Sequence, residues 1–216
     1  MDPLRICYKT FEIGKLDIHV RMLRDTRQYE DKNGVAEKFG ICSAAWPIFG
    51  VIWPASEVLA RLMLEYHVKG KRVLEVGCGI ALASLVLNQR LANITATDYH
   101  PEAGNFLAYN TALNENSGIP FFRTGWDEME NNLGVFDIII GSDLLYERGH
   151  AASLSSFINR HAKGHCDVVI VDPGRGNHRS FTNKMAHLKF LCRQEKPSDS
   201  NKQKKTDKCV ILHFSR

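Results

Sequence analysis

A short apolar run of this chain ends in a glycine-containing turn, Glu75-Val76-Gly77-Cys78-Gly79, and a helical pattern follows it. Glycine suits such a turn because it has no Cβ atom, so the backbone folds sharply and approaches a ligand closely. The dinucleotide fingerprint has a third glycine where this chain has Leu82. This difference argues against NAD or FAD as the ligand, and with them against a nucleotide-dependent oxidoreductase.

Asp98 is the second residue that could contribute chemistry, because it follows Gly77 at about the spacing of 20 residues expected of an acid at the end of the next strand. A carboxylate at that place can accept hydrogen bonds from both hydroxyls of a ribose. The glycine turn alone is equally consistent with a structural turn between strand and helix. Together with Asp98 and the surrounding strand and helix patterns, it favours a site for a ligand that contains a nucleoside.

Three further motifs give these residues a family resemblance. Trp53-Pro54-Ala55-Ser56 lies upstream, Trp126-Asp127 follows the third strand pattern, and Ser142-Asp143-Leu144-Leu145-Tyr146 follows the fourth. With the glycine turn and Asp98, the chain from roughly residue 50 to residue 176 resembles the class I, seven-stranded methyltransferases. More narrowly, it resembles the family-16 lysine methyltransferase-like proteins. The resemblance implies S-adenosyl-L-methionine as the cofactor and no metal.

The resemblance also implies roles for single residues in a cofactor site. The glycine turn would face the methionine part of the cofactor, Glu75 would help to place its amino group, and Asp98 would bind its ribose. Trp126 would pack against the adenine, with Asp127 beside it. The residues expected to bind the cofactor are Trp53, Glu75, Gly77, Cys78, Gly79, Asp98, Tyr99, Trp126, Asp127 and Ser142.

Two of these tryptophans also have structural interpretations. Trp53 lies before a helix pattern, where a lid over the cofactor is expected, but Trp46 and Phe49 lie close by and all three could form an ordinary apolar cluster. Trp126 could instead be a core residue behind the sheet.

Asp143 and Tyr146 are the candidate catalytic residues, because they follow a strand at the edge where this fold exposes its substrate. An amine must lose a proton before it accepts a methyl group, and the free pKa of lysine is about 10.4, so desolvation or a nearby proton acceptor is useful. Asp143 could orient the ammonium and the Tyr146 ring could form a wall of the channel. The structural alternative is a helix-capping acid followed by a packed tyrosine.

The periodicity of apolar residues predicts the elements that position these side chains. A β-hairpin is expected from Phe11 to Met22 around Gly14-Lys15, and an extended loop from Trp46 to Pro54. Helices are expected from Pro54 to near Gly70 and at Leu82–Gln89, Glu102–Leu113, Ala151–His161 and His178–Leu188. Strands are expected at Arg72–Val76, Ile94–Thr97, Pro120–Arg123, Phe136–Ile140, Val168–Val171, Leu188–Arg193 and Cys209–Phe214.

Alternation of strands and helices predicts an α/β protein with a Rossmann-like three-layer fold. The expected sheet has seven mostly parallel strands, and its last two strands form an antiparallel C-terminal pair because no helix separates them. The N-terminal β-hairpin would be an extension of this fold. We expect residues 1–50 to form the extension, packed on a methyltransferase domain that spans residues 51–216.

Composition narrows the classes of partner. The net charge of +4 is mild, and the basic cluster Lys202-Gln203-Lys204-Lys205 is expected to be a solvated loop, so nucleic acid is not an expected partner. Six scattered cysteines without a C-x-x-C pair indicate reduced thiols in a cytoplasmic protein. We find no apolar run that predicts a membrane span, and the oligomeric state is left open.

The leading hypothesis is a methyltransferase that uses S-adenosylmethionine to methylate nitrogen on a lysine side chain of a protein. Two alternatives stay open, since fold does not fix function. One is an N-methyltransferase of small molecules. The other is a non-catalytic module that binds the cofactor and contacts a partner protein through the hairpin and the Trp46–Trp53 loop.

Overall fold

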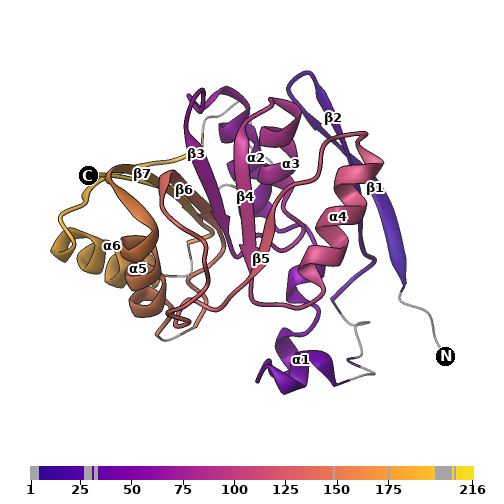
Figure 1. Ribbon diagram of the computed structural model, residues 1–216, viewed down its shortest axis with the longest axis horizontal. Helices are drawn as coiled ribbons and strands as arrows, with labels where there is room; N and C mark the ends of the chain where they lie inside the picture. Colours follow the sequence, from indigo (N-terminus) through magenta and orange to yellow (C-terminus); the bar gives the residue numbers. More distant parts are fainter. Residues whose placement is uncertain are drawn as a thin grey trace.

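The computed structural model describes residues 5–26, 31, 34–147, 149–174, 176–197, 206 and 208–216. The predicted basic loop at 202–205 lies outside these residues. The main body is a seven-stranded sheet of order β5-β4-β3-β6-β7-β9-β8, and helices flank it (Figure 1). Its strands are β3 (Arg72–Val76), β4 (Asn93–Asp98), β5 (Phe121–Arg123), β6 (Phe136–Ser142), β7 (Ala162–Asp172), β8 (Leu191–Glu195) and β9 (Val210–Ser215).

The helices of the main body alternate with these strands as predicted. They are α2 (Pro54–Glu65), α3 (Leu82–Gln89), α4 (Ala103–Leu113), α5 (His150–His161) and α6 (His178–His187). The pairs β5-β4, β4-β3, β3-β6 and β6-β7 are parallel, whereas β9 runs antiparallel to both β7 and β8. The predicted α/β class, the mostly parallel sheet and the antiparallel C-terminal pair are therefore confirmed.

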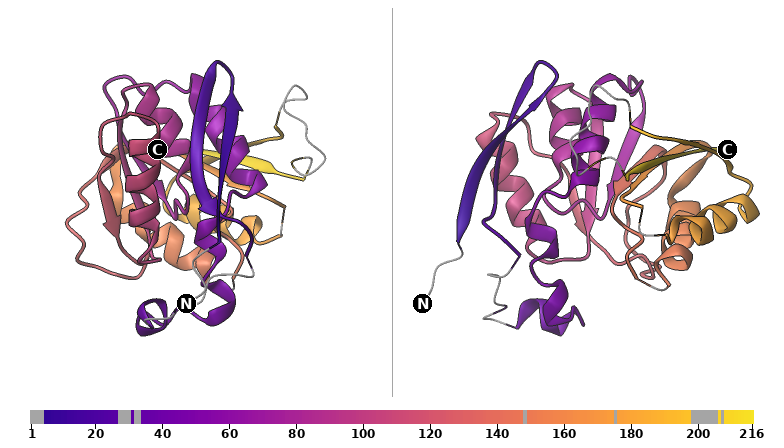
Figure 2. Two further views of the ribbon diagram at one scale, coloured as in Figure 1. Left: turned by 90° about the vertical axis from the view of Figure 1, so that its right-hand side faces the viewer. Right: turned by 180° about the vertical axis from the view of Figure 1, so that it is seen from behind.

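The sheet separates two apolar cores, which gives the predicted three layers. One core joins α2, α3 and α4 to one face of the sheet, and it includes Leu59, Leu85 and Phe106. The other core joins α5 and α6 to the opposite face, and it includes Phe157 and Phe181. Figure 2 shows the N-terminal hairpin outside the first helical layer, beside α4 and away from the sheet.

The hairpin consists of β1 (Ile6–Ile13) and β2 (Leu16–Leu23), and it turns at Gly14 with φ of 62°. Asn110 of α4 and Asn114, the residue that caps the C-terminus of this helix, take the place of a third strand on the free edge of β2. The side chain of Asn114 accepts from the N–H of His19 at 2.8 Å and donates to its carbonyl at 2.7 Å. Asn110 does the same for Arg21 at 2.7 Å and 3.1 Å. These bonds attach the predicted hairpin to the main body.

Residues 39–53, which we call the lid segment, follow the short helix α1 (Val35–Lys38) and contain two 3-10 turns, η1 (Ser43–Ala45) and η2 (Ile48–Gly50). The predicted extended loop from Trp46 to Pro54 is therefore wrong in its first half. The chain turns here because Trp46 and Trp53 make the same kind of hydrogen bond to a carbonyl five residues earlier. Trp46 donates its indole N–H to the carbonyl of Ile41 at 2.8 Å, and Trp53 does the same to Ile48 at 3.0 Å. Each bond closes a compact turn.

By length and composition alone, Ser43–Glu65 is apolar enough to cross a membrane. Length and composition are weak evidence for a membrane span, because the core helix of a soluble protein can be equally long and apolar. In the fold the segment is divided into η1, η2 and α2, and within α2 Leu59 and Met63 are fully buried in the core. Its apolar composition is thus accounted for by packing and by the lining of the cavity described next.

Candidate functional site

A cavity of about 760 Å³ lies where the carboxyl ends of β3, β4 and β6 meet the lid segment. This is the edge at which ligands bind in parallel α/β sheets. The predicted site residues that line the cavity are Trp53, Gly77, Cys78, Gly79, Asp98, Tyr99, Trp126, Asp127, Ser142, Asp143 and Tyr146. The sequence motifs, which are spread over more than 90 residues, therefore face one space.

The glycine turn and Asp98 are joined directly. The N–H of Gly79 donates to Asp98 Oδ2 at 2.8 Å, and the N–H of His100 donates to Oδ1 at 2.8 Å. Gly77 and Gly79 both have positive φ, 58° and 54°, which favours glycine. Burial raises the pKa of Asp98, although the amide donors act in the opposite direction. A carboxylate has about four acceptor sites, so Asp98 keeps acceptor capacity for a ligand hydroxyl beside the amides of Gly79, Tyr99 and His100.

Glu75 lies beneath this turn and outside the set of residues that line the cavity. The residue is 2% exposed, and its carboxyl group accepts from both the N–H and the hydroxyl of Ser84, in the first turn of α3. Burial raises the pKa of Glu75 to about 7. In this structure Glu75 therefore holds the start of α3 behind the glycine turn, and its side chain is not among those that line the cavity.

Phe49 of the lid segment covers the turn from the other side. Its ring stacks on His100 with centroids 3.8 Å apart and an interplanar angle of 16°. A Cβ atom added at Gly79 would lie 2.9 Å from the carbonyl oxygen of Phe49. Burial lowers the pKa of His100 to about 4, so this ring is neutral at physiological pH. The lid segment is thus packed on the turn through a neutral ring pair.

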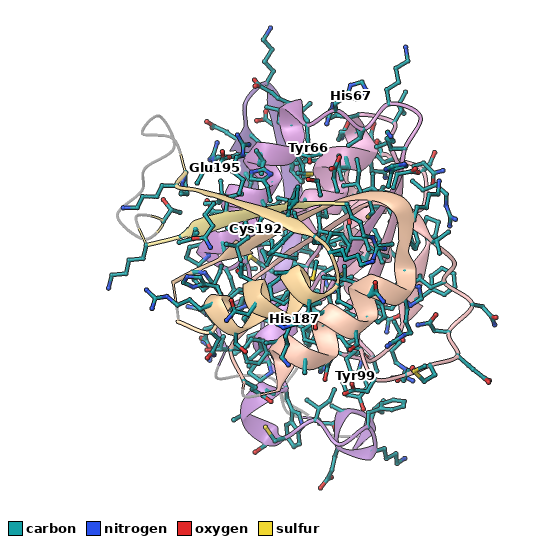
Figure 3. The ribbon with its side chains drawn as sticks, turned by 90° about the vertical axis from the view of Figure 1, so that its left-hand side faces the viewer. Tyr66, His67, Tyr99, His187, Cys192 and Glu195 are labelled. Carbon is teal, nitrogen blue, oxygen red and sulfur yellow. The ribbon has the colours of Figure 1, made fainter. Side chains whose placement is uncertain are left out.

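Phe39, at the start of the lid segment, makes a second attachment. The guanidinium carbon of Arg123 lies 4.0 Å from the centroid of the Phe39 ring, and the hydroxyl of Tyr99 donates to the Phe39 carbonyl. Figure 3 shows Tyr99 at the end of the molecule next to the lid segment, opposite Tyr66 and His67. Tyr99 therefore lines the cavity and also holds the lid segment.

Trp126 and Asp127 form another wall of the cavity. Trp126 is partly buried and packs against the apolar core on the α5 side, so the lining and the core interpretations of this residue both describe part of its surface. Asp127 Oδ2 accepts from the hydroxyl of Ser153 at 3.1 Å. The guanidinium of Arg160 donates to the carbonyl of Trp126 at 2.6 Å and fixes the backbone.

Asp143 and Tyr146 lie just beyond β6, in the same cavity. Asp143 has a φ of 54°, and its N–H donates to the carbonyl of Val171 at 2.9 Å. A positive φ at a residue other than glycine is uncommon and gathers at functional sites. Burial and the nearby carboxylates of Asp98, Glu147 and Asp143 raise the pKa of Tyr146 to about 12. The phenol is therefore protonated at neutral pH.

Several lining residues were not predicted from the sequence. They include Ile41, Ile48, Phe49, His100, His150 and Ser153. A signal for the lid residues exists, because Ile41 to Pro47 and Ile48 to Pro54 repeat the pattern Ile-x4-Trp-Pro. His100 and His150 have no comparable signal. Among the described residues, no three His, Cys, Asp or Glu side chains are grouped in a way that could hold a metal ion.

Comparison with known proteins gives a family match. A family model described as lysine methyltransferase matches residues 44–188. The electron transfer flavoprotein beta subunit lysine methyltransferase of Xenopus laevis is 30% identical over 161 residues, which cover 73% of this chain and 64% of that protein. The protein N-lysine methyltransferase METTL21A of Danio rerio is 34% identical over 110 residues, 46% of this chain and 49% of the relative. The chain thus spans less than two thirds of the length of either relative.

A solved structure supports the fold. The magnesium protoporphyrin IX methyltransferase of Synechocystis PCC 6803 with bound SAM superposes with a TM-score of 0.58 at 17% identity, over 75% of this chain and 77% of that one. At this identity the similarity concerns the fold, which is the Rossmann-like fold predicted from the sequence.

Proposed function

Because this chain belongs to the lysine methyltransferase family, we propose that it binds S-adenosylmethionine in the cavity and methylates the side-chain nitrogen of a lysine in a protein. The observation that carries the proposal is the cavity itself. It brings the glycine turn and Asp98 to the same space as Asp143 and Tyr146. The expected site of the methyl donor and that of the amine that accepts the methyl group are thereby adjacent, as direct methyl transfer requires.

The lining fits a nucleoside cofactor with an amino-acid tail. Asp98 has acceptor capacity for ribose hydroxyls, and Trp126 offers a flat aromatic wall for a purine, next to the carboxylate of Asp127. Gly77 and Gly79 let backbone line the cavity without side chains. When bound, S-adenosylmethionine supplies an electrophilic methyl group on a sulfonium. Relatives named as methyltransferases, and the fold that this chain shares with a structure containing SAM, support this cofactor.

The acceptor side must align a neutral amine and exclude water. The carboxylate of Asp143 orients the incoming ammonium by charge-assisted hydrogen bonding. The ammonium releases one proton to solvent at the mouth of the cavity, and the neutral amine then has its lone pair free for the methyl carbon. The Tyr146 ring, 41% exposed, forms the wall at the mouth of the cavity. The lid segment, held by Phe39 and Phe49, closes the opposite side.

Calorimetric titration with S-adenosylmethionine tests the donor site. We expect micromolar binding to the wild type, and a loss of at least about a hundredfold in Asp98→Ala, because two hydroxyl bonds to a charged acceptor disappear. NAD is the matched control ligand and is expected to bind weakly. Tighter binding of NAD than of S-adenosylmethionine would contradict the proposal.

Transfer of a labelled methyl group to a library of lysine peptides and folded proteins tests the acceptor site. We expect Asp143→Ala to bind S-adenosylmethionine nearly as well as the wild type and to lose most of its transfer activity. If the wild type binds S-adenosylmethionine tightly but methylates no acceptor in a broad cell extract, the non-catalytic binding module becomes the better account. If it methylates only small amines, the protein substrate is wrong.

We also propose a cytoplasmic location. All six cysteines are free, which fits a reducing compartment. A fluorescent fusion of the chain with cell fractionation tests this proposal, and recovery of the protein with membranes or in the secretory pathway would contradict it.

A further inference from the structure

His150 lies between the two aromatic side chains that line the cavity on the α5 side. Its ring centroid is 5.2 Å from that of Trp126 at an interplanar angle of 81°, and 4.7 Å from that of Tyr146 at 80°. Both are edge-to-face contacts, which aromatic rings favour. We propose that His150 is a positioning residue that holds Trp126 and Tyr146 in place for the methyl transfer. The inference rests on the function proposed above.

His150 is itself held firmly, as a positioning residue must be. Its Nδ1 lies 2.9 Å from the carbonyl oxygen of Leu144, in the segment between Asp143 and Tyr146. Its Nε2 lies 3.4 Å from a carboxylate oxygen of Glu147. The residue is also the first of α5, so its backbone is fixed by the helix. The ring is therefore anchored on the acceptor segment and on the helix at once.

The loop of Trp126 is fastened to the same helix. Ser153 donates to Asp127 at 3.1 Å, and Arg160 donates to the carbonyls of Trp126 at 2.6 Å and Glu128 at 3.3 Å. The two Arg160 bonds fix the loop backbone and the Ser153 bond holds the Asp127 side chain, but none of the three bonds involves the Trp126 ring. The orientation of the Trp126 indole on the α5 side is set by its contact with His150, and the same imidazole sets the orientation of Tyr146.

The consequence is that one side chain serves both halves of the site. A change at His150 should weaken the wall against which the cofactor packs and loosen the wall of the acceptor channel together. The ring contacts predict that another ring at position 150 can take over this role, although the hydrogen bond to Leu144 is then lost. An amide at position 150 could keep that bond but would lose the contacts with both rings.

Three variants separate these possibilities: His150→Ala, His150→Phe and His150→Asn. The measurements are the dissociation constant for S-adenosylmethionine by calorimetry and the near-ultraviolet circular dichroism of the aromatic side chains. We expect His150→Ala to weaken binding by about two- to tenfold, the effect of losing one ring pair, and to reduce the aromatic signal. His150→Phe should restore both properties, and His150→Asn should restore neither.

His187→Ala is the matched control, because it removes a helix histidine from the exposed surface of α6, where Figure 3 labels it. It should leave both measurements unchanged. Wild-type affinity and an unchanged aromatic signal in His150→Ala would overturn the proposal, as would rescue by Asn without rescue by Phe. If the wild type fails to bind S-adenosylmethionine, the proposed function fails, but the circular dichroism of the variants still tests whether His150 holds the two rings.

With a peptide acceptor found for the wild type, kinetics give a further test. His150→Ala should raise KM for the acceptor and lower kcat, and His150→Phe should recover both. A variant that melts at a lower temperature but keeps its KM and kcat would assign His150 a structural role only.

Discussion

At the scale of single residues, the contact between Gly79 and the lid segment decides how tightly the cavity can close. Gly79 has positive φ and donates to Asp98, and the carbonyl of Phe49 lies where a Cβ atom of residue 79 would be. Backbone cannot move aside as the end of a flexible side chain can. The absence of a side chain at residue 79 therefore permits both the positive φ of the turn and the close packing of the lid segment on it.

Gly79→Ala should therefore cost more than the strain of a left-handed residue. That strain alone is about 1 to 2 kcal/mol. Gly70→Ala is the control for it, because Gly70 has φ of 74° and, in the described part of the chain, an added Cβ would meet nothing within 4 Å beyond its chain neighbours. We expect urea unfolding to show a larger loss for Gly79→Ala than for Gly70→Ala. Only Gly79→Ala should also weaken binding of S-adenosylmethionine. Equal losses in both variants, with unchanged binding, would show that the lid does not depend on this contact.

Position in the sequence and the family resemblance together indicated much of the candidate site. Asp98, Asp143 and Tyr146 could be selected because they lie at the ends of predicted parallel strands, which meet at one edge of the sheet, whereas the role of Trp126 came from the resemblance. Glu75 could not be placed the same way, since its side chain points behind the turn to Ser84, and alternation along β3 is obscured where both sheet faces are buried. Their roles in binding and catalysis stay predictions until the variants are measured.

At the scale of elements, Asn110 of α4 and its C-cap residue Asn114 hold the hairpin to the main body. Asn110→Ala or Asn114→Ala would leave one N–H and one carbonyl of β2 without their partner in a buried contact. Each change should lower the free energy of unfolding by about 1 to 3 kcal/mol. Amide hydrogen exchange should be faster in β2 and unchanged in β3.

Asn105→Ala is the control on the same helix, because Asn105 is exposed and, among the described residues, its side chain bonds only to Glu102. It should change neither stability nor exchange by a measurable amount. Protection of β2 that survives loss of both Asn110 and Asn114 would mean that apolar packing alone holds the hairpin.

Elements with strong periodicity were predictable, and those built by side-chain bonds were not. The strand β3 and the helix α3 have the predicted bounds, because a short apolar run and a three- to four-residue stripe are distinct patterns. The stretch from Trp46 to Pro54 was predicted as extended because Pro and Gly break helices. Its turns depend on the indole bonds of Trp46 and Trp53, which no local propensity reveals.

At the scale of the whole molecule, we propose a division into an N-terminal extension, residues 1–50, and a methyltransferase domain, residues 51–216. The extension contributes to the cavity through Ile41, Ile48 and Phe49, and it supplies the partner of His100. We therefore expect a chain that begins at residue 51 to lose binding of S-adenosylmethionine even where circular dichroism shows that it folds. Binding at full affinity would show that the lid segment is dispensable.

Two buried groups also give the whole molecule opposing responses to pH. Burial raises the pKa of Glu75 from 4.5 to about 7, so the folded protein holds a proton that the unfolded chain releases. The contribution of Glu75 to the free energy of unfolding is fully present below pH 4.5 and is lost as the pH rises to about 7. Burial lowers the pKa of His100 from 6.5 to about 4, although Asp31 acts in the opposite direction. The folded protein therefore lacks a proton that the unfolded chain binds. As the pH rises from about 4 to 6.5, the contribution of His100 to the free energy of unfolding increases.

The wild type should accordingly show a shallow pH dependence of stability between about pH 4.5 and 7, whereas single variants should not. In Glu75→Gln the amide oxygen can still accept from Ser84, and the free energy of unfolding should rise with pH by up to roughly 3 kcal/mol relative to the wild type. In His100→Gln it should fall by a similar amount. Urea unfolding of all three proteins across this range measures the slopes, and other titrating groups cancel in the comparison because all three proteins share them. Parallel profiles in the three proteins would mean that neither side chain is buried as deeply as the fold places it.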